Sequence, residues 1–395
     1  MTGGRRAAWV AGGYAAQGLG YATLVTALPQ LKERQDVDDT FVSVILLLVC
    51  VAAAAGSVVA DRVAARLGSR YALAGGLLTI AVALALITVR TPTVAFTAIL
   101  ILYGVGLGAV DASLNMQGVL VQLRMGRSVM NRLFAAYTAA AIMAALLMSA
   151  FAAGGAGASF AVGVAALFAG AYVLAAWHAL VPDRTAVVAA GVPASLTDRT
   201  RHIIWICGAF VLTGFLADSA VSTWSSIYLD DSLSAPAAIV PLGYAAYQAM
   251  VLLSRLTGDH LVPRVGRATA VTVALLVCAA GCLMVTVVPT VPAAITGFAL
   301  AGLGVGLLIP IAFSAAGEAA AGRSDAVLAR VNLFNYAGAL LGAVLLGVLS
   351  EPVGLRWAFL VPVLGLLLTV PVVRALRHLP TTHSNVATPT PLPPK

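Results

Sequence analysis

Charged residues are scarce in this chain of 395 residues. Only 10% are Asp, Glu, Lys or Arg, against roughly 25% in a soluble globular domain. Hydrophobic residues make up 61%. This imbalance excludes an ordinary water-soluble domain and favours a chain embedded in lipid. The sequence also lacks a nucleotide-binding loop, which argues against any process driven by ATP.

Cysteine is also rare, and the four residues lie inside apolar runs without zinc-ligand spacing or a readable disulfide framework. No nucleophile–base pair is visible either. We therefore expect that the protein is not an enzyme and that it binds no cofactor and no metal. The formal charge of +8 comes from arginines in short clusters between apolar runs. Because they form no single basic patch, nucleic acid is excluded as a partner.

The apolar residues form twelve runs of about 20 residues, the length that an α-helix needs to cross a bilayer. Only helices and closed barrels satisfy backbone polar groups in lipid, and these runs are too long for barrel strands. We therefore predict an all-α membrane protein with twelve transmembrane helices. The predicted spans are 7–31, 41–64, 71–89, 93–121, 131–153, 158–181, 202–229, 238–262, 267–288, 291–317, 327–350 and 355–377.

Landmark residues of the first half recur in the second half at a constant offset of 198 residues. They are Asp61, Arg66, Gly68, Gly104, Gly106 and Gly108, which recur as Asp259, Arg264, Gly266, Gly302, Gly304 and Gly306. Two like apolar halves are the layout of many secondary transporters, whose substrate site lies where the repeats meet. We therefore predict two pseudo-symmetric six-helix bundles at 1–182 and 202–379, a cytoplasmic linker at 183–201 and a disordered tail at 380–395.

Basic residues are distributed unevenly between the two sides of the predicted helices. With a cytoplasmic N-terminus, 18 of the 23 basic residues fall on the inner side, whereas the outer loops hold four and are rich in acids. Cytoplasmic loops carry an excess of Lys and Arg. We therefore expect a multi-pass protein of the cell inner membrane with both termini cytoplasmic.

The basic loops after the second and eighth helices, together with twelve helices in two halves, resemble the major facilitator superfamily over nearly the whole chain. The superfamily places an acid where Ala65 and Pro263 stand here, and this chain has its acids one helical turn earlier. The resemblance implies the major facilitator fold and a gating role for these loops; the alternative is that their charges only fix topology. The gating-loop candidates are Asp61, Arg66, Gly68, Asp259, Arg264 and Gly266.

Two segments are similar to a bacterial branch related to fucose permease. They are 104–118, with its glycine triplet and polar pair, and 224–229 with its leading Trp. The first helix departs from sugar–proton symporters of this kind because it has no acid, and Gln17 is its nearest polar residue. The fourth helix lacks the Arg of many proton-driven drug pumps. Despite these departures, the resemblance to this branch implies symport of a small polar solute.

Asp111 is the most informative acid within a predicted span. An Asp at the bilayer centre costs roughly 2.5–3.5 kcal/mol on insertion scales, so such residues usually face a cavity or a partner. Asp111 shares a helix face with Asn115, and the repeat replaces the two residues by Ile309 and Phe313. Because the polar pair is present in one half of the chain and absent from the other, we favour a proton-coupling role for Asp111. The alternative is a structural hydrogen bond or ion pair.

Asp218 is the second proton-coupling candidate, because it lies in the middle of the seventh predicted span; a satisfied interhelical bond is the alternative. We expect Glu318 to be a solvated helix end. Arg255 is the one basic residue within a predicted span. One interpretation is that it pairs with Asp259 one turn away. The alternatives are that it neutralises an acid in the cavity or binds an anionic substrate.

Aromatic and amide side chains in the presumed cavity helices are the substrate-binding candidates. Tyr and Trp near helix ends are often interfacial anchors instead, and we expect this of Tyr228. The candidates are Gln17, Tyr21, Asn115, Tyr137, Trp224, Tyr247, Gln248, Asn332, Asn335 and Tyr336.

These features together predict a monomeric secondary active transporter that moves a small organic solute across the membrane by alternating access. Its expected partners are the solute, protons and the lipid bilayer. The alternatives are an efflux pump for hydrophobic or cationic compounds and a non-transporting membrane sensor with the same fold.

Overall fold

The computed structural model describes residues 3–125, 129–180, 198–319 and 324–376. Within these ranges the chain is almost entirely helical. Of the predicted linker at 183–201, residues 183–197 lie outside the described residues. The predicted tail at 380–395 lies wholly outside them.

The first half of the chain forms six long helices close to the predicted spans. They are α1 (Gly3–Gln35), α2 (Asp39–Leu67), α3 (Ser69–Ile87), α4 (Thr93–Met125), α5 (Met130–Ala153) and α6 (Ala158–Ala176). Helices α1, α2 and α4 extend a few residues beyond the predicted span, whereas α6 ends five residues before it.

The second half repeats this pattern with two local changes. Its elements are α7 (Asp198–Ile227), the π-helical turn η1 (Tyr228–Ser232), α8 (Val240–Val265), α9 (Arg267–Val287), α10 (Val291–Ala319), α11 (Ser324–Val353), α12 (Leu355–Ala358), α13 (Leu360–Thr369), η2 (Val370–Val372) and α14 (Val373–Leu376). The twelfth span was predicted as one helix but is broken at Phe359 and at η2. Pro362 and Pro371 explain both breaks, since proline lacks an N–H and clashes with the carbonyl four residues earlier.

Ten of the described helices are long and apolar enough to cross a membrane. The two long helices outside this set are α1 and α8, in which Tyr and Gln side chains interrupt the apolar run. A helix of this length and lower apolarity is suited to a position between other helices or beside water.

The glycine triplets place the backbones of neighbouring helices in direct contact, identically in the two halves. A Cβ at Gly104 would overlap the backbone of Val49 on α2, and a Cβ at Gly302 would overlap the backbone of Tyr247 on α8. Val49 and Tyr247 are themselves related by the offset of 198. The structure thus confirms the internal repeat at the level of single contacts, since small residues allow helices to approach closely.

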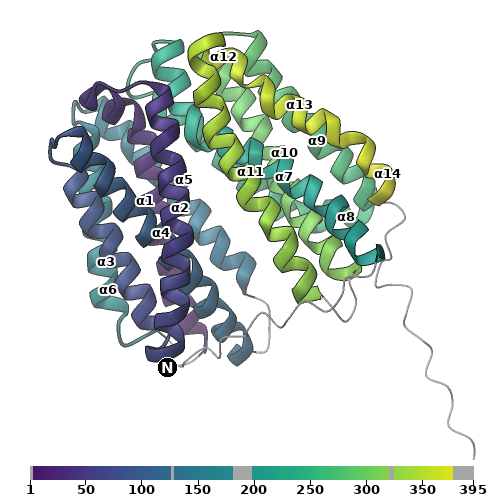
Figure 1. The fold of residues 1–395 in the computed structure, drawn as a ribbon, viewed down its shortest axis with the longest axis horizontal. Helices are drawn as coiled ribbons and strands as arrows, with labels where there is room; N and C mark the ends of the chain where they lie inside the picture. Colours follow the sequence, from purple (N-terminus) through teal and green to yellow (C-terminus); the bar gives the residue numbers. More distant parts are fainter. Residues whose placement is uncertain (1–2, 126–128, 181–197, 320–323, 377–395) are drawn as a thin grey trace, which may run out of the picture.

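The two halves meet along two equivalent seams. Helix α2 packs against α11, and α5 packs against α8, as the repeat symmetry requires. In Figure 1, α2 and α11 lie close together at the end distant from the N-terminus, here called the far end, and diverge toward the end that carries the N-terminus. The predicted architecture of two six-helix bundles is therefore confirmed.

Glycine-mediated packing generates a stability prediction. A Cβ at Gly108 would overlap the Ala53 carbonyl and one at Gly306 would lie 2.7 Å from the Val251 carbonyl oxygen, whereas Gly75 on α3 has nothing within 4 Å. We expect Gly108→Ala and Gly306→Ala each to destabilise the protein by about 1–3 kcal/mol through overpacking. Gly75→Ala should be neutral or slightly stabilising, because Ala is the better helix former. Thermal denaturation in detergent measures all three; equal midpoints would contradict the close-contact account.

Candidate functional site

Two hydrogen bonds join α1 to α4 in the first half. The Gln17 Nε2 donates to an Asp111 carboxylate oxygen at 3.3 Å, and the Tyr14 hydroxyl donates to the Asn115 Oδ1 at 2.9 Å. Gln17 and Tyr14 are buried, whereas Asp111 is exposed. Asp111 therefore bonds to α1 through Gln17, and its side chain is otherwise exposed.

Asp218 on α7 is the acid within a span of the second half, at a position that the repeat does not relate to Asp111. The Tyr247 hydroxyl of α8 donates to its carboxylate, and Asp218 is half-buried. Tyr21 of the first bundle and Arg255 of the second interact electrostatically with Asp218. Asp218 therefore lies close to the boundary between the two bundles.

Arg255 spans that boundary directly. Its Nη1 donates to the Thr138 hydroxyl on α5 at 3.4 Å, which links the two bundles along the α5–α8 seam. The side chain of Asp259, one of the predicted partners of Arg255, lies outside the described residues. Arg255 acts electrostatically on Asp218 but forms no ion pair with it among the described residues, so its role stays a prediction.

Two aromatic candidates are packed away from water. Trp224 is fully buried, and its indole N–H donates to the Ala343 carbonyl on α11 at 2.9 Å. Tyr228 was expected to anchor the protein at the membrane interface, but that expectation is wrong. It is fully buried, and its hydroxyl donates to the Val285 carbonyl at 3.0 Å. Both rings join helices of the second bundle.

The amide candidates of the second half have side-chain partners within their own helices. Gln248 donates to the Tyr244 hydroxyl at 2.6 Å, and Asn335 donates to Asn332 Oδ1 at 3.1 Å. Tyr336, next to Asn335, is 60% exposed. The asparagine pair presents a polar turn on α11 that is half-buried and open to a further partner.

Several polar groups near these candidates were not recognised in the sequence. Tyr14 lies one helical turn from Gln17, and Tyr244 lies one turn from Gln248, so the three- and four-residue helical spacing gave a usable signal. Tyr103 on α4 is 1% exposed, and its hydroxyl has no hydrogen-bond partner among the described residues. No local sequence pattern distinguishes such a tyrosine from an ordinary core residue.

The two repeated loops turn at equivalent glycines. Gly68 ends α2 with a φ of 110°, and Gly266 ends α8 with a φ of 84°. Because these are left-handed φ values that L side chains rarely adopt, glycine permits α3 and α9 to begin at the next residue.

The charged loop candidates are exposed where they are described. Asp61, Arg66 and Arg264 are exposed, and the Asp259 side chain lies outside the described residues. Asp61 and Arg66 form no hydrogen bond or ion pair within the described part of the chain. Their predicted gating role therefore stays a prediction.

The first residue of the helix that follows each glycine is bonded to the helix after it, and the bond differs between the two halves. In the first half the Gln117 Nε2 on α4 donates to the Ser69 hydroxyl at 2.8 Å. In the second half, Arg267 at the equivalent position forms an ion pair of 2.7 Å with Glu318 on α10. The expectation that Glu318 is a solvated helix end is therefore wrong, because Arg267 neutralises it at the helix surface.

An ion pair and a hydrogen bond close the far end between the bundles. The Lys32 ammonium on α1 lies 2.5 Å from Asp39 and also pairs with Asp231 of η1. The Ser149 hydroxyl on α5 donates to the Ala238 carbonyl at 2.5 Å. The far end is therefore held together, while Figure 1 shows α2 and α11 apart at the opposite end.

Two pseudo-symmetric helical bundles, joined at one end and bearing facing polar residues near their boundary, form the architecture of secondary transporters. The family model of the Major Facilitator Superfamily matches residues 10–323 and 206–395. The chain therefore belongs to the major facilitator superfamily and is a membrane transporter by family.

Curated relatives share about a quarter of their residues with this chain. An uncharacterised MFS-type transporter of Yersinia pestis is 27% identical over 348 residues, covering 87% of this chain and 88% of the relative. The membrane protein MosC of Rhizobium meliloti is 26% identical over 344 residues, covering 87% and 83%. The closer resemblance to the branch related to fucose permease stays a prediction.

Solved structures with much lower identity share the fold. The nucleoside transporter NupG superposes with a TM-score of 0.70 at 14% identity, covering 94% of this chain and 99% of that one. A bacterial homologue of the human lysosomal transporter Spinster, in an inward-facing and unoccupied conformation, has a TM-score of 0.76 at 11% identity, covering 95% and 97%. At these identities the likeness concerns the fold alone.

The bond between Tyr247 and Asp218 is open to a double-mutant cycle. Tyr247→Phe removes the hydroxyl that donates to the carboxylate, and we expect a loss of about 1–3 kcal/mol because a half-buried acceptor loses its donor. Combining it with Asp218→Leu should cost less than the sum of the two single changes, since the pair acts as a unit. Thermal denaturation of the four proteins measures the coupling, and strict additivity would show that the two side chains are independent.

Removing the Lys32 ammonium should loosen the far end. We expect Lys32→Gln to weaken closure by about 1 kcal/mol, the scale of a partly exposed ion pair. Spin labels at Arg90 and Glu351, one exposed site in each half, should then show longer distances by double electron–electron resonance in a Cys50→Ser background. Asp198→Asn, which breaks the exposed Asp198–Arg201 pair, is the control and should leave the distances unchanged. An unaltered distance distribution in Lys32→Gln would contradict a closing role.

Proposed function

We propose that this protein is a secondary active transporter that couples the movement of a small organic solute to protons by alternating access. The observation that supports it is a pair of carboxylates, Asp111 and Asp218, one on a helix of each bundle. Each is bonded to a neutral donor, Gln17 or Tyr247, and neither forms an ion pair with a described basic residue.

A neutral partner suits a carboxyl group that must gain and lose a proton. An ion pair would hold the carboxylate in its charged form, and breaking a buried pair costs several kcal/mol. An amide N–H or a phenol hydroxyl can bond to the carboxyl group in both protonation states. Asp111 and Asp218 can therefore change charge without loss of their hydrogen-bonded positions.

The half-buried polar side chains around the boundary are the proposed contacts for the solute. Tyr21 and Tyr137 come from the first bundle, and Asn332 and Asn335 come from the second. Hydroxyl and amide groups offer both donors and acceptors, which fits a small polar organic solute. In the proposed cycle the bundles rock about the α2–α11 and α5–α8 seams, in the inner membrane and as a monomer with cytoplasmic termini.

A second candidate substrate class is an organic cation, handled by import or by efflux. Tyr21, Tyr137, Tyr244 and Tyr247 all interact electrostatically with Asp218. A carboxylate without an ion pair attracts a cation and repels an anion. Asp218 therefore favours a cation over an anion, whichever direction the solute moves.

The coupling role of Asp111 is tested in proteoliposomes, after a ligand-stabilisation screen has supplied a solute. We expect Asp111→Asn to exchange labelled solute across the membrane but to lose accumulation driven by a pH gradient, because the amide cannot carry a proton. A pyranine signal for solute-induced proton movement should disappear in the same variant.

Asp198→Asn is the matched control, because this acid is fully exposed at the start of α7. The control should retain both accumulation and the proton signal. Accumulation of solute against its gradient by Asp111→Asn would remove Asp111 from the coupling mechanism.

A further inference from the structure

An open cavity of about 610 Å³ lies at the far end, apart from the central carboxylates. Its walls come from both bundles: Gln30, Glu33 and Arg34 lie on α1, Arg90 precedes α4, and Asp230 belongs to η1. The remaining lining residues are mostly apolar and come from α1, α5 and the start of α8. The cavity therefore lies across the boundary between the bundles, and its shape depends on how the two bundles are placed relative to each other.

The acidic part of this cavity consists of two carboxylates without partners. Glu33 and Asp230 form no hydrogen bond or ion pair through their carboxylates in the described ranges of the chain. Glu33 on the other bundle and Asp231 beside it repel Asp230 electrostatically, whereas the Lys32 ammonium attracts it. Like charges brought together in this way are stabilised by a cation between them.

The basic part consists of two arginines. The Arg34 side chain is fixed by bonds from its terminal nitrogens to the Ile87 carbonyl at 2.6 Å and to the Ser159 hydroxyl at 3.3 Å. Its Nε is buried without a partner among the described residues. Arg90 lies near it and is exposed. Arg34 is therefore held in place as a fixed positive charge, and the exposed Arg90 guanidinium is the group that can donate to a carboxylate or another anion.

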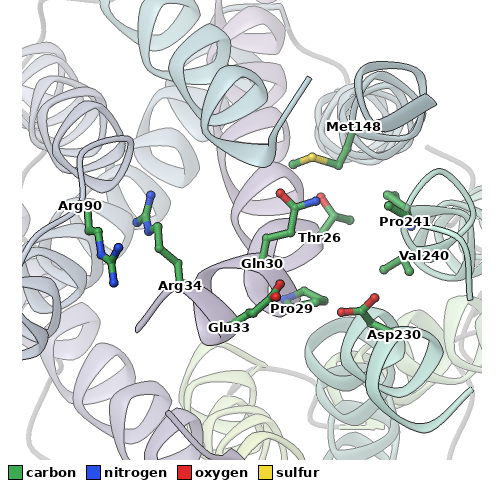
Figure 2. Close-up of a pocket in the computed structure, with 11 residues that line it drawn as sticks. Thr26, Pro29, Gln30, Glu33, Arg34, Arg90, Met148, Asp230, Val240 and Pro241 are labelled. Carbon is green, nitrogen blue, oxygen red and sulfur yellow. The ribbon is translucent and has the colours of Figure 1, made fainter. Parts of the chain in front are cut away.

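The two poles are separate. Figure 2 shows the Arg34 and Arg90 guanidinium groups on one side of the cavity, the Asp230 carboxylate on the other, and Glu33 between them. Gln30 lies along the same wall, with its Oε1 held by the Ala158 N–H at 2.8 Å, so that its amide N–H groups are free to donate. The formal charges of the four ionised side chains cancel.

The backbone that presents Asp230 is irregular. Asp230 lies in the π-helical turn η1, and Ser234 shortly after it has a φ of 47°. A left-handed residue just after the last turn is a common helix ending, so this geometry fixes where Asp230 lies without itself indicating a site.

We propose that this cavity at the far end binds a zwitterionic small molecule, with its ammonium group between Glu33 and Asp230 and its carboxylate at Arg34 and Arg90. Such a ligand neutralises both poles at once, whereas a simple cation or anion neutralises only one. Because the site includes residues of both bundles, the ligand binds best when the far end is closed and stabilises that conformation. This site does not depend on the central carboxylates.

The test uses purified full-length protein and ω-amino acids from β-alanine to 6-aminohexanoate, with n-butylammonium and butyrate as analogues that carry one charge each. We expect at least one ω-amino acid to raise the midpoint of thermal denaturation with saturation. The one-charge analogues should need at least about tenfold higher concentrations, because each loses a charge-assisted hydrogen bond.

Asp230→Asn and Arg90→Gln should each weaken the response by about tenfold or more. Arg90 is exposed, so its substitution tests the site even if Asp230→Asn fails to fold. Glu351→Gln, an exposed acid of α11, is the matched control and should respond like the unaltered protein. Asp111→Asn should also respond normally, which separates this site from the proposed transport mechanism.

Three results would overturn the proposal. One is the absence of a midpoint shift with any member of the ω-amino acid series. Another is an equal response to the one-charge analogues. The third is a full response in both Asp230→Asn and Arg90→Gln, which would place binding elsewhere or assign the shift to a general solute effect.

Discussion

Hydrocarbon offers no hydrogen bonds, so every polar group of this chain within the bilayer must find its partner inside the protein or in a wet space that the protein encloses. Helices meet this requirement for the backbone. For side chains, it directs polar residues to the surfaces between helices, where Gln17 meets Asp111 and Tyr247 meets Asp218. The same constraint explains why α1 and α8, which carry Gln17 and Tyr247, are long yet less apolar than the other spans. Their polar faces are directed toward other helices.

Packing and chemistry obey the internal repeat to different degrees. The glycine contacts of α4 with α2 recur between α10 and α8 almost atom for atom, because both halves need their backbones close together. The polar groups do not recur: Asp111 corresponds to Ile309, and the neutral bond of Ser69 corresponds to the ion pair of Arg267. A duplicated scaffold thus supports two different sets of side chains, and the bundles are free to take different parts in one cycle.

The seam between the bundles concentrates the features that a transporter needs. It holds the ion pair of Lys32 with Asp231, the bond from Arg255 to Thr138 and the charged cavity at the far end. These polar contacts lie beside apolar packing, since Val42 on α2 and Ala141 on α5 belong to one buried cluster with residues of the second bundle. Polar contacts of this kind can break and form again as the bundles move, because their groups can exchange one partner for water.

The sequence by itself determined the class of the protein, the helical spans and the repeat. These follow from the length of apolar runs and from the spacing of small residues, which are local properties of the chain. It did not reveal that Tyr228 is buried, that Glu318 is paired with Arg267 or that Tyr247 is the partner of Asp218. Such pairings depend on how each helix is rotated and where it crosses its neighbours. The tertiary structure alone decided them, since rotating a helix about its axis by the angle of one residue, about 100°, changes which helix a side chain meets.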